Sequence, residues 1–255
     1  MGRRPPLAIA IALVLASAGP ACGIGVACAA DDATMRRPAP TQGEAMARAC
    51  ARLPRVTVHA SSAQDAETAC EGAGRALDFL ARAGLDGPSE TTIEIVPELP
   101  GDLAGRAFGC YVPETRRILL VDFDAFRAAG GWFGMPPSRE LYRAVASHEV
   151  AHAVAGGHAA PRRLPAAAHE YVAYVTLFAT MDPPLRAAIL DRFPGSGFAT
   201  VGQISDLNHV VAPNRFGVDA WRHYLKARDR DAWLRRVIAG EVVPEGAPDP
   251  DASSR

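Results

Sequence analysis

The pattern of hydrophobic and polar positions along the chain predicts strands in the first half and helices in the second. Short segments rich in alternating apolar residues are typical of half-buried strands. They cover residues 55–60, 91–96, 107–112 and 116–123. The last two of these strands form a predicted hairpin around Pro113-Glu114-Thr115.

Two helices are predicted among these strands. Residues 44–53 read as a short helix that Pro54 ends. A longer helix follows the first strand, where Ser61 and Gln64 form a candidate capping box. Apolar residues then recur at helical spacing as far as a stop signal at Gly84.

From Ser138 onward the apolar residues recur at helical spacing, in runs that Gly- and Pro-rich loops separate. These runs cover about 139–156, 165–181, 184–193 and 215–239. A sheet-bearing lobe (about 44–135) followed by a helical lobe (about 138–242) predicts an α+β fold in a single domain over 31–242. The proline- and acid-rich residues 243–255 are predicted to be disordered.

The first 30 residues have the layout of a bacterial secretory signal peptide. Two arginines precede an apolar run over 7–15, and small residues rich in alanine follow it. Cleavage after Ala18 and cleavage near residue 30 both fit this layout. Because the apolar run is too short to span a bilayer, the mature protein is predicted to be periplasmic or extracellular, without a stable membrane span.

Charge and cysteine content refine this prediction. Removing residues 1–30 leaves 25 basic and 28 acidic residues, a net charge of −3, which gives no reason to expect nucleic acid as a partner. A lipoprotein attached through Cys22 or Cys28 is the less favoured alternative, because neither cysteine follows a leucine at the usual position. An oxidising compartment permits a disulfide, and Cys50–Cys70 is the predicted pair; the alternative is that Cys70 is a buried small residue.

The segment from His148 to His152 reads H-E-x-x-H, the pattern of a zinc-binding helix. Residues four apart lie on one face of a helix, so both imidazoles can bind one zinc ion. Glu149 then lies close enough to activate a water molecule as the nucleophile. The segment runs from a candidate cap at Ser138 without an internal proline, and its apolar neighbours argue against an ordinary surface helix.

A catalytic zinc ion needs a third protein ligand, and two residues compete for this role. Glu170 is the only formally charged side chain between residues 166 and 181, in an apolar helix where a carboxylate needs a cation. His158 stands six residues after His152, as in H-E-x-x-H-x-x-G-x-x-H, but alanine occupies the glycine position. Glu170 is therefore favoured over His158, and His169 is a weaker candidate because it projects away from Glu170.

An H-E-x-x-H helix followed by a second helix bearing glutamate resembles the gluzincin group of zinc metallopeptidases, over about residues 90–180. The resemblance implies a zincin-like fold in which His148, His152 and Glu170 bind one zinc ion. It also implies that Glu149 is the general base and that a zinc-activated water hydrolyses the peptide bonds of a peptide or protein. Two alternatives remain: an inactive zincin-fold protein that binds a peptide or cell-wall partner, and a zinc hydrolase of a non-peptide amide.

Gluzincins usually add a histidine or tyrosine that stabilises the oxyanion of the reaction. The candidates for this role here are Tyr171, Tyr174, His209 in a predicted loop, and His223. In the same architecture an edge strand above the active site commonly pairs with an extended substrate. Residues 116–123 are predicted to form that edge strand.

Overall fold

The computed structural model describes residues 46–158 and 164–242. The predicted signal peptide and C-terminal tail lie outside the described residues, so both stay predictions. The strands are β1 (Met46–Cys50), β2 (Leu53–Ala60), β3 (Thr91–Val96), β4 (Gly109–Val112) and β5 (Arg117–Val121). The helices are α1 (Ala63–Arg82), α2 (Phe123–Ala128), α3 (Arg139–His158), α4 (Ala166–Thr180), α5 (Pro183–Arg192), α6 (Asp206–Val211), α7 (Pro213–Lys226) and α8 (Arg230–Ile238).

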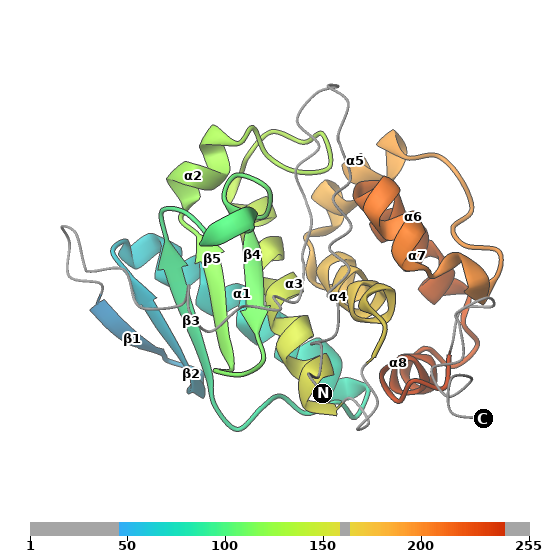
Figure 1. The fold of residues 1–255 in the computed structure, drawn as a ribbon, viewed down its shortest axis with the longest axis horizontal. Helices are drawn as coiled ribbons and strands as arrows, with labels where there is room; N and C mark the ends of the chain where they lie inside the picture. Colours follow the sequence, from blue (N-terminus) through green and yellow to red (C-terminus); the bar gives the residue numbers. More distant parts are fainter. Residues whose placement is uncertain (1–45, 159–163, 243–255) are drawn as a thin grey trace, which may run out of the picture.

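The strands form one mixed sheet in the order β1-β2-β3-β5-β4. β2, β3 and β5 run parallel, whereas β1 and β4 pair antiparallel at the two edges. The crossover between the parallel neighbours β2 and β3 contains α1. Figure 1 shows α3 between the sheet and α4, with α5 to α8 beyond α4. The predicted α+β fold, a sheet followed by helices, is confirmed.

Local signals place several element boundaries. β3 covers the predicted residues 91–96, and β4 and β5 form the predicted hairpin. The N-cap of α1 is Ser62 rather than Ser61, because the Ser62 side chain accepts a hydrogen bond from the Asp65 amide at 3.2 Å. Gly84 has a φ of 75° just after the helix, which is the left-handed conformation that favours glycine.

The helix predicted over 44–53 is wrong. Within that range residues 46–50 form β1, which pairs antiparallel with β2 from Met46 opposite Ala60. Alanine, methionine and arginine favour a helix, but this propensity is weak compared with the pairing that an adjacent strand offers. The predicted helical run over 215–239 is likewise two helices, because Asp229 caps α8 by accepting a hydrogen bond from the Ala232 amide at 2.9 Å.

The prediction that residues 116–123 form an edge strand is also wrong. β5 lies between β3 and β4, and its residues from Ile118 to Val121 are buried. A continuous apolar run suits a strand that is covered on both faces, so β5 belongs inside the sheet. The edge strand beside α3 is β4.

Close packing of α1 against α3 holds the helix that bears the H-E-x-x-H motif. A Cβ atom on Gly72 of α1 would lie 2.6 Å from the carbonyl oxygen of Arg143, so only glycine permits this approach. The Ser147 hydroxyl donates a hydrogen bond to the Gly72 carbonyl at 2.9 Å. At the start of α3, the buried Asp65 accepts hydrogen bonds from the Phe123 amide and the Arg139 guanidinium. These contacts fix α3 relative to α1 and α2.

The predicted Cys50–Cys70 disulfide is present and ties β1 to α1. Because its two cysteines are 20 residues apart, we expect Cys50→Ala to lower the free energy of unfolding. The expected loss is about 3 kcal/mol, since a bond that closes a loop of this length restricts the unfolded chain. Denaturant unfolding of Cys50→Ala, Cys70→Ala and the double variant measures it. The double variant should lose no more than either single one, and unchanged stability in all three would contradict the prediction.

Candidate metal centre

α3 places both motif histidines on one buried face. His148 and His152 are one helical turn apart, and their Nε2 atoms lie 3.2 Å from one another. Both side chains are 0% exposed, and Glu149 between them is 1% exposed. The apolar residues that flank the motif on every side explain this burial, because α3 packs against α1, α4 and the sheet.

α4 brings Glu170 to the same point. Its Oε2 atom lies 3.5 Å from His148 Nε2, and its Oε1 atom lies 3.6 Å from His152 Nε2. The ligand atoms of these three residues all lie within 4.8 Å of one another, and Glu170 is also buried. The structure therefore brings together the residues that the sequence nominated as metal ligands.

The donor set of this cluster fits a metal ion. Two ligands at 2.0–2.2 Å from a tetrahedral zinc ion are about 3.3–3.6 Å apart. The Nε2–Nε2 distance of 3.2 Å is close to this separation, and each imidazole nitrogen has one Glu170 oxygen at a similar distance, Oε2 at 3.5 Å from His148 and Oε1 at 3.6 Å from His152. In addition, Glu170 Oε2 is buried without a hydrogen-bond partner in the described part of the chain. A cation between the three side chains would satisfy that oxygen and both facing nitrogens.

Burial keeps the two imidazoles neutral. It lowers the pKa of His148 to about 3, and the nearby His209 adds to the effect. Burial also lowers the pKa of His152 well below its ordinary value, and His148, His169 and His209 lower it further. Neutral imidazole is the form that binds a metal ion, so no proton has to leave either ring at pH 7.

The carboxyl groups respond to burial in the opposite direction. Burial raises the pKa of Glu149 to about 8. For Glu170, burial and then the charges of Glu149 and Asp206 hold the pKa well above its ordinary value. Both shifts show that ionised carboxylates are costly in this pocket without a cation. A bound divalent ion would favour the ionised form of Glu170.

The rival metal ligands lie elsewhere. His158 is exposed at the end of α3, and its Nε2 atom contacts the carbonyl oxygen of Asp86 at 2.7 Å. The His169 ring lies 6.1 Å from the His152 ring, but His169 is not part of the ligand cluster. Of the three candidates for the third position, the structure places only Glu170 with His148 and His152.

The four oxyanion candidates divide into two pairs. The Tyr171 hydroxyl lies 2.8 Å from His223 Nδ1 and accepts a hydrogen bond from Trp233 Nε1 at 2.9 Å, so this pair links α4, α7 and α8. His209 instead faces the cluster, with its Nε2 atom 3.5 Å from Glu170 Oε2. The Tyr174 ring centroid is 4.8 Å from that of His148. His209 and Tyr174 are thus the two candidates beside the ligand cluster.

His209 reaches the cluster from a helix rather than from the predicted loop. Ser205 caps α6, and Asp206 at its first position accepts a hydrogen bond from the Ala167 amide of α4 at 2.7 Å. His209 lies one turn after Asp206 on the same side of α6 and is 5% exposed. Asp206 therefore anchors α6 to α4 with His209 turned towards Glu170.

Sequence reasoning missed two neighbours of the cluster. Trp132, in the loop between α2 and α3, has its ring centroid 5.7 Å from that of His148. Gly109 on β4 approaches Glu149 so closely that a Cβ atom there would lie 2.5 Å from Glu149 Cγ. The glycine-rich run Gly130-Gly131-Trp132-Phe133-Gly134, just before α3, was the sequence signal for Trp132.

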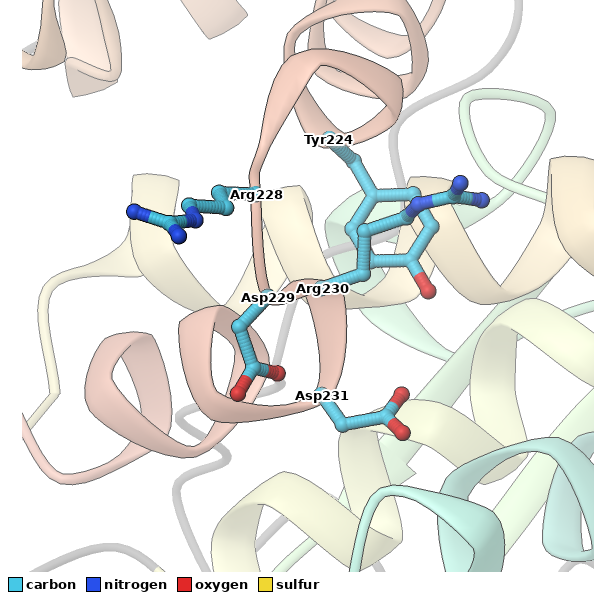
Figure 2. A pocket seen from close by; sticks show the side chains of 5 residues that line it. All are labelled: Tyr224, Arg228, Asp229, Arg230 and Asp231. Carbon is cyan, nitrogen blue, oxygen red and sulfur yellow. The ribbon is translucent and has the colours of Figure 1, made fainter.

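A hollow elsewhere on the molecule is unrelated to this cluster. Figure 2 shows it at the turn between α7 and α8, with a volume of about 560 Å³. Its lining consists of Tyr224, Arg228, Asp229, Arg230 and Asp231, none of which belongs to the ligand cluster. Since Asp229 caps α8 from this turn, the hollow belongs to a helix connection.

Fold and cluster together define an α+β protein with a buried group, His148, His152 and Glu170, that could hold a metal ion. Residues 56–247 match the family described as "Family of unknown function (DUF6639)", and the chain belongs to this family. The matched segment contains the whole ligand cluster. No curated protein and no solved structure matches the chain. Over the described residues, no helix has both the length and the apolar character of a membrane span.

Proposed function

We propose that this chain is an exported, zincin-type zinc metallopeptidase with a gluzincin-like ligand set. The observation that carries the proposal is the convergence of His148, His152 and Glu170 with Glu149 adjacent to them. Two imidazoles and one carboxylate form a ligand set that catalytic zinc sites use, with a fourth position left open. When bound, zinc supplies a Lewis acid that polarises a substrate carbonyl and lowers the pKa of water.

Glu149 is the proposed general base. Its side chain cannot point at the metal in the same direction as that of His148, because consecutive helical residues point in directions about 100° apart. Its Oε2 atom is buried and has no hydrogen-bond partner among the described residues, so it is available to a reacting group. Glu149 takes a proton from the attacking water and passes it to the nitrogen of the leaving amine.

His209 is the proposed group that stabilises the developing oxyanion. Its Nε2 atom is buried and without a hydrogen-bond partner in the described part of the chain. It lies across the cluster from α3, since α6 brings it to the Glu170 side. The hydrogen bond between Asp206 and the Ala167 amide fixes α6, so an N–H of His209 is already in place when charge develops on the substrate oxygen.

β4 replaces β5 as the proposed substrate-binding strand. It is the edge strand beside α3, and Gly109 brings its backbone against Glu149. An extended peptide that pairs with a sheet edge gains backbone hydrogen bonds, and side-chain pockets then add specificity. On β4 this pairing would place a peptide bond beside the general base.

Gly109 offers a sharp test of this arrangement. A Cβ atom at this position would lie 2.5, 2.7 and 2.8 Å from Glu149 Cγ, Cδ and Oε1, so Gly109→Ala must displace that carboxylate. We expect kcat to fall about 100-fold with the metal content unchanged, since a displaced base no longer meets the water. Gly156→Ala is the matched control, because its Cβ atom would meet the Tyr111 side chain, nearest at Cε1 at 3.2 Å, and not Glu149. Equal activity of the two variants would count against the assigned base.

The test of the function combines metal analysis with a substrate panel. The exported protein, purified without chelator, is expected to contain about one zinc ion per chain. It should also cleave members of a peptide library, and a chelator should stop this cleavage. Absence of stoichiometric metal would overturn the proposal. Bound zinc without cleavage of any peptide would favour the binding-protein alternative, and hydrolysis of other amides alone would favour the non-peptide hydrolase.

A further inference from the structure

The imidazole of His148 lacks the support that a metal-binding histidine usually has. Such a ring normally donates its second N–H to a carboxylate, a backbone carbonyl or a water, and this bond fixes its orientation. His148 Nδ1 is buried and has no hydrogen-bond partner among the residues that the structure describes. No hydrogen bond to Nδ1 therefore fixes the ring, and the contact of His148 Nε2 with His152 Nε2 at 3.2 Å lies on the side where the metal would bind.

Aromatic rings occupy the space around His148. The Trp132 ring centroid lies 5.7 Å from that of His148 with the planes at 80°, and the Tyr174 centroid lies 4.8 Å away at 69°. Trp132 and Tyr174 also contact one another at 6.0 Å. The two contacts with His148 are edge-to-face, an arrangement that aromatic rings favour because the positive edge of one meets the negative face of the other.

Such packing can determine how the ring is turned. The outer torsion of a histidine side chain has a broad preference, so the plane of the ring can rotate at little intrinsic cost. For His148 such a rotation would move Nε2 out of line with His152 and Glu170. His148 is buried, so the plane of its ring can rotate only if neighbouring rings such as Trp132 and Tyr174 move.

The loop between α2 and α3 presses Trp132 against His148. A Cβ atom on Gly131 would lie 2.2 Å from the Met135 carbonyl oxygen, and Gly131 has a φ of 93°, so the loop is wound tightly. Phe133 has a φ of 55°, a conformation that costs energy for an aromatic residue. Trp132 Nε1 has no hydrogen-bond partner in the described ranges, so packing rather than hydrogen bonding holds the indole as well.

We propose that Trp132, with Tyr174, is a positioning residue that holds the His148 ring in its metal-binding orientation, in place of the usual hydrogen bond to Nδ1. This inference rests on the proposed metal site. It assigns a role to the glycine-rich loop that the ligand set and the general base leave unexplained. It also separates this site from zinc sites in which carboxylates orient the histidines.

The test compares Trp132→Leu with Phe133→Leu. Both residues are buried side by side in the same loop. Phe133 packs against Trp132, Tyr174, Phe178 and Phe193, but unlike Trp132 it has no ring contact with His148. The Kd for Zn²⁺ is measured on the metal-free proteins by competition with a chromophoric chelator. We expect Trp132→Leu to raise this Kd about 10–100-fold, the usual effect of losing a residue that orients a ligand. Trp132→Phe should recover most of the affinity.

Phe133→Leu controls for general loosening of the loop. We expect it to lower the thermal midpoint of the metal-free protein but to leave the Kd for Zn²⁺ near the wild-type value. The visible absorption of the Co²⁺-substituted protein should change for Trp132→Leu and not for Phe133→Leu. An unchanged Kd in Trp132→Leu, or an equal rise in both variants, would overturn the positioning role while the metal site stands. A wild-type protein that binds no Zn²⁺ would instead overturn the proposed function, and this inference with it.

Discussion

Replacing Glu149 with glutamine is expected to lower kcat for peptide hydrolysis by about 10²–10⁴-fold, the usual contribution of a general base. Glutamine has the shape of glutamate but cannot accept the proton from the attacking water. The metal content should remain at about one ion per chain, because the three ligands are His148, His152 and Glu170. Activity and zinc content are measured on the same preparations.

Glu140→Gln is the matched control for this prediction. Glu140 lies in the first turn of the same helix, but its side chain is exposed and distant from the cluster in sequence. We expect this variant to keep both zinc and activity. Loss of zinc in Glu149→Gln would make Glu149 a ligand rather than a base, and full activity in that variant would remove it from the mechanism.

In the metal-free protein, Glu149→Gln is also expected to change how the free energy of unfolding depends on pH. Burial raises the pKa of Glu149 to about 8 in the folded chain, compared with an ordinary value of 4.5. The folded state therefore holds this proton more tightly, and the resulting stability is present below pH 4.5 and is lost as the pH rises through about 8. Glu149→Gln has no such proton, so its stability should fall less than that of the wild type over this interval.

Removal of the metal is expected to lower the thermal midpoint of the wild type by about 8–16 °C. A ligand at about 1,000 times its Kd stabilises the folded state by about 4 kcal/mol. In a chain of this size each kcal/mol changes the midpoint by about 2–4 °C. The physical reason is local: without a cation, the buried carboxyl group of Glu170 and two facing imidazole nitrogens have no adequate partner.

Two histidine variants make this prediction specific. His152→Ala should lose the zinc, and a chelator should leave its midpoint unchanged. His158→Ala should keep both the zinc and the chelator effect, because His158 is exposed and contacts Asp86 instead of the cluster. Melting curves with and without chelator measure both. The ligand assignment would be contradicted if His158→Ala lost zinc, or if chelator left the thermal midpoint of the wild type unchanged.

The sequence by itself determined what depends on near neighbours along the chain. The H-E-x-x-H motif and its burial follow from i, i+4 spacing and apolar flanks, and α3 was predicted from the same pattern. β3 and the β4–β5 hairpin follow from short apolar runs and a turn signal. Glu170 stood out because a carboxylate in an apolar helix needs a partner, and the Cys50–Cys70 pair was a correct prediction.

The tertiary structure decided everything that depends on contacts between distant segments. In the folded protein residues 46–50 form a strand, β5 lies inside the sheet, and β4 is the edge strand beside Glu149. The tertiary structure also brought His209 and Trp132 to the cluster and left His158 outside it. Local signals for these results are weak, such as the continuous apolar run of β5, because sheet order and loop placement follow from burying whole faces together. The sequence thus supplied the candidate metal ligands, and tertiary packing determined which residues surround them.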